Sequence, residues 1–188
     1  MAEYGESWEG ITAYFNGEWM PQSQVKIDPR DKGFTSSDVV FDVCRTFNGK
    51  IFRLEYHIDR LYRSLKYSRL DPGLSREEMT DISVEAVNRN EPLRADTGDY
   101  YIRQFVTRGV GRWSHTAGPA NVYVMLNPID VGDFATIFRD GLHAVIARTR
   151  SYPVEALDSK IKHFSRMNFA QAEWEAADVD PDACPGAP

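Results

Sequence analysis

Two Asn-Gly pairs, each at the end of a β-prone run, constrain the fold of this 188-residue chain more than any other feature of its sequence. Asn16-Gly17 follows the run 11–15, and Asn48-Gly49 follows the run 39–47. A two-residue hairpin turn needs a positive φ at both positions, which asparagine and glycine tolerate best. Each pair therefore predicts a tight β-hairpin, and two hairpins predict an antiparallel sheet.

Helical patterns follow the second hairpin. Apolar residues recur at helical spacing over 54–65, and the breaker sequence 71–73 (Asp-Pro-Gly) ends that pattern. The segment 75–78 (Ser-Arg-Glu-Glu) has the form of a capping box that opens a second helix. Two more strands are predicted near 100–107 and 122–126. This order of elements predicts an α+β domain with its helices on one face of an antiparallel sheet.

The rest of the chain is too short to form a complete second domain. The sequence predicts a linker at 130–133, a strand over 142–147 and a helix over 165–177. One strand and one helix cannot bury their own apolar faces. We therefore expect an N-terminal α+β domain over 1–130, followed by the incomplete beginning of a second domain over 131–188.

Composition excludes several classes of function. The 22 Lys and Arg against 28 Asp and Glu give a net charge of −6, so no basic field would attract a nucleic acid. No run approaches the roughly 20 apolar residues that span a bilayer, and no signal peptide or metal-binding motif is recognisable. Cys44 and Cys184 lie far apart and form no CxxC motif, which is typical of unpaired thiols in a reducing compartment. We expect a cytoplasmic protein without a metal.

Four basic residues, at three places in the sequence, are candidates for chemistry. Lys160 and Lys162 precede the last predicted helix, where partial desolvation would make an amine nucleophilic, although a solvated surface lysine is the simpler interpretation. Arg60 lies on the first turns of a helix and could grip a phosphate, or could simply be solvated. Arg103 stands among aromatic residues of a strand, where it would either have an internal partner or bind a carboxylate.

The order of these pieces resembles a known family. The run 41–64, FDVCRTFNGKIFRLEYHIDRLYRS, is similar to the N-terminal signature of class IV (fold type IV) pyridoxal-phosphate aminotransferases. Residues 101–103 (Tyr-Ile-Arg) resemble the strand with which branched-chain enzymes hold a substrate carboxylate. Residues 158–163, with Asn168 and 175–176 (Glu-Ala), resemble the lysine segment that opens the family's second domain. The resemblance covers roughly 10–183 and implies that the second domain is α/β and pseudo-barrel-like.

The resemblance implies a role for two of the candidate residues in binding pyridoxal 5'-phosphate. Lys162 would bind the cofactor covalently and later move the α-proton. It is preferred to Lys160 because its spacing to 175–176 matches the family. Arg60 would bind the cofactor phosphate. The cofactor would act as the electron sink, and the protein would supply orientation and electrostatics.

The resemblance also implies the substrates and the assembly. Arg103, with Tyr101, would orient the substrate carboxylate in a ping-pong transfer of an amino group from a branched-chain-like amino acid, or an amine, to a 2-oxo acid. Residues 35–38 (Thr-Ser-Ser-Asp) look closer to the (R)-selective amine transaminases, so the donor class stays open. Family members are homodimers and continue well past the lysine helix, which implies a C-terminally truncated member. The alternatives are a non-catalytic remnant and an aminodeoxychorismate lyase-like enzyme.

Overall fold

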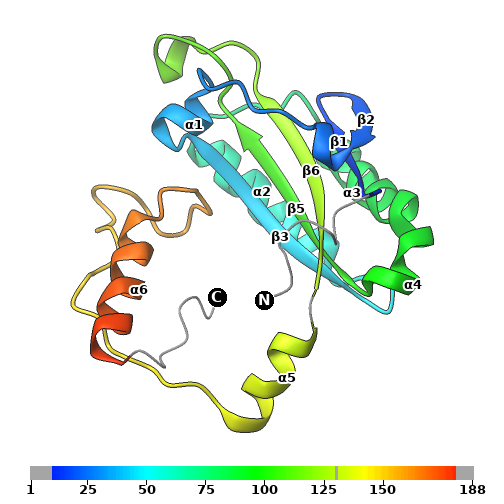
Figure 1. The fold of residues 1–188 in the computed structure, drawn as a ribbon. Coiled ribbons are helices and arrows are strands. Elements are labelled where there is room, and N and C mark those ends of the chain that lie inside the picture. The colour runs from blue at the N-terminus through cyan, green and yellow to red at the C-terminus, as the bar shows by residue number, and fades with distance from the viewer. Residues whose placement is uncertain (1–9, 130, 181–188) are drawn as a thin grey trace. The chain divides into compact units, whose positions relative to one another are not determined.

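The computed structural model describes residues 10–129 and 131–180, which divide into two compact units (Figure 1). The N-terminal unit takes in the described residues up to Ile129 together with Ile161–Phe164. We call these four residues the lysine segment. The C-terminal unit takes in the other described residues.

A six-stranded sheet forms the centre of the N-terminal unit. The strands are β1 (Thr12–Phe15), β2 (Glu18–Pro21), β3 (Val39–Phe47), β4 (Lys50–Ile51), β5 (Tyr100–Thr107) and β6 (Asn121–Pro128). Their order is β2-β1-β6-β5-β3-β4, and all paired neighbours are antiparallel. Both predicted hairpins form, and all four turn residues have positive φ: 47° and 96° at Asn16 and Gly17, 49° and 76° at Asn48 and Gly49.

Two long helices, α2 (Leu54–Tyr67) and α3 (Arg76–Asn90), lie against one face of this sheet (Figure 1). The predicted capping box opens α3, because Ser75 Oγ accepts from the Glu78 amide at 3.1 Å and Glu78 accepts from the Ser75 amide at 2.7 Å. The shorter helices are α1 (Lys32–Ser36), α4 (Arg94–Thr97) and 3-10 turns at Gln22–Gln24, Glu91–Leu93 and Ser114–Thr116. The predicted α+β class, with helices on one sheet face, is confirmed.

Alternation along the strands separates a helix-covered face from an open face. The core lies between the helix-covered face and the two long helices, where Val40, Ile102 and Leu61 are almost completely buried. On the other face, three aromatic side chains stand in register across the three central strands: Phe41 opposite Phe105, and Phe105 opposite Tyr123. We use the term open face for the side of the sheet that these three residues share with Val43, Arg103 and Met125.

The C-terminal unit contains α5 (Val131–Asp140) and α6 (Met167–Val179). The predicted helix at 165–177 therefore forms with its start two residues later. The predicted linker at 130–133 is wrong from Val131 onward, because α5 begins there; residue 130 lies outside the described residues.

The predicted strand at 142–147 is also wrong. This stretch contains a single bridge residue, His143, and no strand, and Ile146 is 95% exposed. A strand requires a neighbour for its backbone groups, and no described strand pairs with this stretch. The residues that follow it are instead held by Glu175, which accepts from the Arg148 amide and the Thr149 hydroxyl, each at 2.6 Å.

No described helix is long and apolar enough to cross a membrane. Within residues 10–129 and 131–180, no group of His, Cys, Asp and Glu side chains could hold a metal ion. Cys44 is a buried free thiol, and burial raises its pKa to about 11, so it is not a reactive thiolate at neutral pH. Cys184 lies outside the described residues.

Candidate active site

A buried carboxylate on β3 organises one side of the candidate site. Asp42 alternates with apolar residues of the strand and points to the helix-covered face, toward α2. Two α2 residues three positions apart share one helix face and both reach it. Arg60 binds Asp42 through Nε at 2.7 Å and Nη2 at 2.8 Å, and His57 Nδ1 lies 2.8 Å from the same carboxylate.

These contacts keep the Asp42 carboxylate ionised. Burial by itself would raise the pKa of Asp42, but the hydrogen bonds from Arg60 and His57 outweigh it and hold this pKa below its usual value. An ionised carboxylate can only accept, so His57 carries a proton on Nδ1. Arg60 remains 44% exposed, and its Nη1 group makes no hydrogen bond to the described residues. Arg60 therefore has free donors for an external anion.

The lysine segment extends the sheet at the edge of β3. Phe41 N donates to Lys162 O at 3.0 Å, Phe164 N donates to Val39 O at 3.3 Å, and His163 forms an antiparallel bridge with Val40. Alternation then directs residues 162 and 164 to the open face. Lys162 Nζ lies 4.4 Å from the centre of the Phe41 ring. The centres of the Phe41 and Phe164 rings are 4.5 Å apart.

A single hydroxyl joins the predicted arginine to the predicted lysine. Ser64 Oγ donates to the Arg60 carbonyl at 3.1 Å and accepts from the Lys162 amide at 3.2 Å. Two residues that are far apart in the sequence are therefore held at one edge of the sheet. Their side chains approach it from different sides, Arg60 against Asp42 and Lys162 over Phe41. Lys160 belongs to the C-terminal unit, where its amide donates to Asp158.

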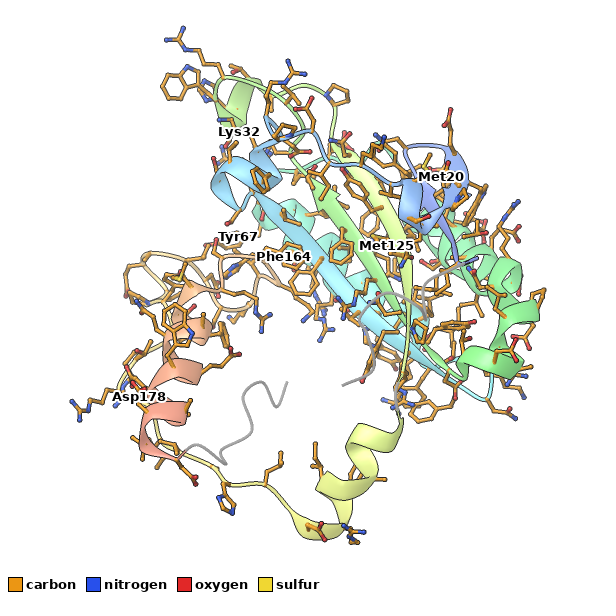
Figure 2. All side chains as sticks on the ribbon, viewed as in Figure 1. Met20, Lys32, Tyr67, Met125, Phe164 and Asp178 are labelled. Carbon is orange, nitrogen blue, oxygen red and sulfur yellow. The ribbon has the colours of Figure 1, made fainter. Side chains whose placement is uncertain are left out.

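The open face contains a cavity of about 410 Å³. Its lining is mostly apolar and includes Arg103: the residues are Val25, Ile27, Gly33, Phe34, Val39, Arg103, Phe105, Thr107, Tyr123, Met125, Asn127 and Phe164. Figure 2 shows Met125 and Phe164 on this side of the sheet. Arg103 Nε is buried without a hydrogen-bond partner, and no described residue forms an ion pair with this guanidinium. Of the two interpretations of Arg103, internal partner or ligand-binding group, the described contacts favour the second.

One wall of the cavity is α1, and a buried aspartate holds this short helix in place. Asp31 caps it by accepting from Gly33 N, and also accepts from Thr107 Oγ1 and Asn121 Nδ2, each at 2.6 Å. Gly33 packs so closely on β5 that a Cβ there would lie 2.8 Å from Thr107. The close packing leaves Phe34, which is 71% exposed, on the rim of the cavity.

The chain is similar to known proteins over most of its length. The family described as "Amino-transferase class IV" matches residues 39–184, which include β3, α2 and the lysine segment. The chain belongs to this family. A Methanocaldococcus jannaschii protein provisionally named a branched-chain-amino-acid aminotransferase is 32% identical over 166 residues, which are 87% of this chain and 54% of that protein. The D-alanine aminotransferase of Staphylococcus aureus is 33% identical over 103 residues, 55% of this chain and 35% of that enzyme.

Solved structures share the fold of this class IV aminotransferase chain. The branched-chain amino acid aminotransferase of Thermobaculum terrenum, crystallised in its pyridoxal-phosphate holo-form, has a TM-score of 0.74 at 22% identity, over 90% of this chain and 56% of that one. The branched-chain aminotransferase of Thermoproteus uzoniensis has a TM-score of 0.77 at 21% identity, over 90% and 57%. The chain thus spans about half the length of these proteins.

Tyr101 occupies a different part of the open face of the class IV chain. It lies two residues before Arg103 on β5, opposite Arg45 and Asn127, and is not one of the residues that line the cavity. The structure therefore brings Arg103 and Phe164 together in one cavity, and leaves Tyr101 beside it on the same face of the sheet.

Sequence reasoning missed three residues of the site: Asp42, His57 and Ser64. One signal was available, because Asp42 is an acidic residue at an inward position of an otherwise apolar strand, which requires a cationic partner. His57 lies one helical turn before Arg60, which is the spacing that lets two helix residues bind the same carboxylate. Ser64 had no signal, because its partner Lys162 comes from a distant part of the sequence.

Proposed function

We propose that this chain contributes the cofactor-binding lysine and arginine of a pyridoxal-phosphate-dependent aminotransferase. The enzyme would move an amino group from a branched-chain-like amino acid, or an amine, to a 2-oxo acid. The observation that supports this most directly is the hydroxyl link that holds Arg60 and Lys162 at one edge of the sheet. Family membership supports the same reaction class.

The residues present fit the cofactor. Pyridoxal phosphate needs an amine for covalent attachment and a cation for its phosphate, and when bound it supplies an electron sink for chemistry at the amino carbon. Lys162 would hold it through Nζ and move a proton with the same amine. Arg60 would bind the phosphate through its free Nη1 donors while Asp42 fixes the rest of its guanidinium.

The cavity on the open face would take the substrate. Arg103 would bind the substrate carboxylate, assisted by Tyr101 from two residues earlier on β5, and the unsatisfied Nε supports this assignment. The apolar residues around it would accept a branched aliphatic side chain. A D-amino acid donor is the second candidate, because the relatives include D-alanine aminotransferases.

Three further statements belong to the proposal. Residues 131–188 would form the beginning of the cofactor-binding domain that follows the N-terminal domain over 1–130. The functional assembly would be a homodimer. The location would be the cytoplasm, which agrees with a buried free thiol at Cys44.

Covalent trapping tests the proposal. Pyridoxal phosphate is added to the purified chain, the near-visible spectrum is recorded, and borohydride reduction followed by peptide mapping locates the modified lysine. We expect the label on Lys162. Lys162→Ala should lose it, and the matched control Lys160→Ala should keep it, because Lys160 belongs to the other unit. A folded wild-type chain that traps no cofactor would favour the non-catalytic alternative, and a label on Lys160 would move the assignment.

Arg103→Met tests the substrate assignment. Loss of a charge-assisted hydrogen bond costs about 1.5–3 kcal/mol, so kcat/KM for L-leucine or D-alanine should fall roughly 10- to 100-fold. An (R)-amine without a carboxylate should be affected far less. Equal losses for the amino acids and the amine would contradict a carboxylate-binding role. The ratio between L-leucine and D-alanine decides between the two donor candidates.

A further inference from the structure

Ser64 interrupts the hydrogen-bond ladder between β3 and the lysine segment. The bonds from Phe41 N to Lys162 O and from Phe164 N to Val39 O are those of a regular antiparallel pair. Continued regular pairing would direct the Lys162 amide to the Phe41 carbonyl. That amide donates instead to Ser64 Oγ at 3.2 Å. The ladder therefore ends at Lys162 because a side chain of α2 replaces the strand as acceptor.

The hydroxyl itself is held in place. It donates to the Arg60 carbonyl one turn earlier in α2, at 3.1 Å, and the serine is 2% exposed. Because the Ser64 hydroxyl donates its only proton to the Arg60 carbonyl, its oxygen can act only as an acceptor toward the Lys162 amide. Other described contacts also attach the lysine segment to the N-terminal unit: the two bonds to β3, the buried side chain of Ile161, the Lys162 amine over the Phe41 ring and the ring of Phe164. Residues on both sides of it belong to the C-terminal unit.

From this geometry we infer that Ser64 is a positioning residue that sets the location of Lys162 relative to Arg60. The inference rests on the proposed function, in which these two residues hold opposite ends of one cofactor. A fixed backbone at Lys162 orients its amine for attack without a search through other conformations. Without the hydroxyl, the Lys162 amide would lose its hydrogen bond to α2, which helps to fix the register of the lysine relative to this helix.

The chain offers a closely matched control. Ser83 lies in α3, is fully buried, donates to the Met79 carbonyl one turn earlier at 2.7 Å, and accepts from Gln104 Nε2 on β5 at 3.1 Å. Like Ser64, Ser83 donates to a carbonyl one turn earlier in its helix and accepts from an amide N–H group across the helix–sheet interface. Its acceptor bond, however, does not involve the lysine segment. Ser64→Ala and Ser83→Ala remove the same group from the same type of environment. Ser64→Thr keeps the hydroxyl.

Amide hydrogen exchange in the full chain without cofactor is the first measurement. We expect the Lys162 amide to exchange at least tenfold faster in Ser64→Ala than in the wild type, and to be unchanged in Ser83→Ala. Ser64→Thr should restore protection. If Lys162 is equally protected in Ser64→Ala and Ser83→Ala, the inference is wrong. Should Ser64→Ala fail to fold, Ser64→Cys, which replaces the hydroxyl by a weaker acceptor of the same connectivity, takes its place with the same expectation.

The rate of covalent trapping of pyridoxal phosphate is the second measurement. Trapping on Lys162 should be at least tenfold slower in Ser64→Ala than in Ser83→Ala at the same cofactor concentration. Equal rates would overturn the positioning role even if exchange differed. If the wild-type chain traps no cofactor, the proposed function fails, while the exchange experiment still decides whether Ser64 positions Lys162.

Discussion

At the scale of single residues, the charged groups of the site depend on one another. Asp42 is buried with two hydrogen-bond donors from α2, and its carboxylate holds the guanidinium of Arg60 by two bonds. The Nε and Nη2 groups of Arg60 are bound to Asp42, and the side chain as a whole stays 44% exposed. The same arginine therefore has a structural contact and a proposed phosphate contact. Replacing it would weaken both folding and cofactor binding, so Asp42 is the better position at which to test the structural contact.

Asp42→Asn should lower the free energy of unfolding at pH 7 by about 2 kcal/mol, because hydrogen bonds to a charged group are replaced by poorer ones to an amide. The folded-state pKa of Asp42 lies below its usual value of 3.8. The ionised carboxylate therefore stabilises the fold fully above about pH 4, and this contribution is lost as the pH falls through the folded pKa. The difference between variant and wild type should shrink as the pH falls below 4.

Urea unfolding at several pH values measures this difference. Asp28→Asn is the control, because Asp28 also pairs with an arginine, Arg30, but on the surface. It should change the unfolding free energy little at any pH. A difference between Asp42→Asn and wild type that persists unchanged at pH 3 would contradict the assignment of the charge to Asp42.

At the scale of secondary structure, local signals and long-range contacts contribute separately. The first turn of α3 is held by the reciprocal bonds of its capping box, which do not involve the sheet. Ser75→Ala should therefore cost about 1 kcal/mol of stability. Thr80→Ala, on the same helix, removes a hydroxyl that bonds the Arg76 carbonyl inside the helix and should cost little. Thermal unfolding of the two variants compares them, and equal losses would contradict the cap.

The lysine segment depends on tertiary contacts instead. Phe164 packs against Phe41 and Phe105, with ring centres 4.5 and 5.2 Å apart. Phe164→Ala should lower the unfolding free energy by about 2 kcal/mol, below the range for a fully buried ring because this ring is partly exposed. Its control is Phe169→Ala, which removes a similarly exposed ring from α6. If the Phe169 variant lost as much stability as the Phe164 variant, the aromatic cluster would not be what anchors the segment.

At the scale of the whole molecule, a ligand that binds only the folded state must stabilise it. With pyridoxal phosphate at about 100 times its dissociation constant, the gain is about 2.7 kcal/mol, and for a chain of this size the melting temperature should rise by about 5–10 °C. Lys162→Ala should keep its N-terminal unit folded, and pyridoxal phosphate should raise its melting temperature less than that of the wild type. Inorganic phosphate should raise the melting temperature of the wild type slightly, and Arg60→Ala should remove this rise. An equal rise with pyridoxal phosphate in wild type and Lys162→Ala would mean that the cofactor binds elsewhere.

The sequence by itself determined the elements whose signals are local. The positive-φ turns at Asn16-Gly17 and Asn48-Gly49, the apolar periodicity of α2 and the capping box of α3 are all formed as predicted, because each depends on residues within a few positions of one another. The same patterns, with the resemblance of 41–64, were enough to predict the family.

Local signals failed where the outcome depends on a partner. Residues 142–147 are as β-prone as the true strands, yet no described strand pairs with them, and they form no strand of their own. Residues 131–133 of the predicted linker are the start of α5, whose short apolar pattern was not recognised. A strand is stabilised by hydrogen bonds to a neighbour, so its sequence alone cannot show whether it forms.

Only the tertiary structure decided how the site is assembled. It paired Asp42 with Arg60 across two elements and left Arg103 Nε without a partner on the open face. It also joined Lys162 to Ser64 and to β3 across most of the chain. These contacts depend on which strand edge remains free and which hydroxyl faces it. Both follow from the packing of the whole N-terminal unit, so no short stretch of sequence encodes them.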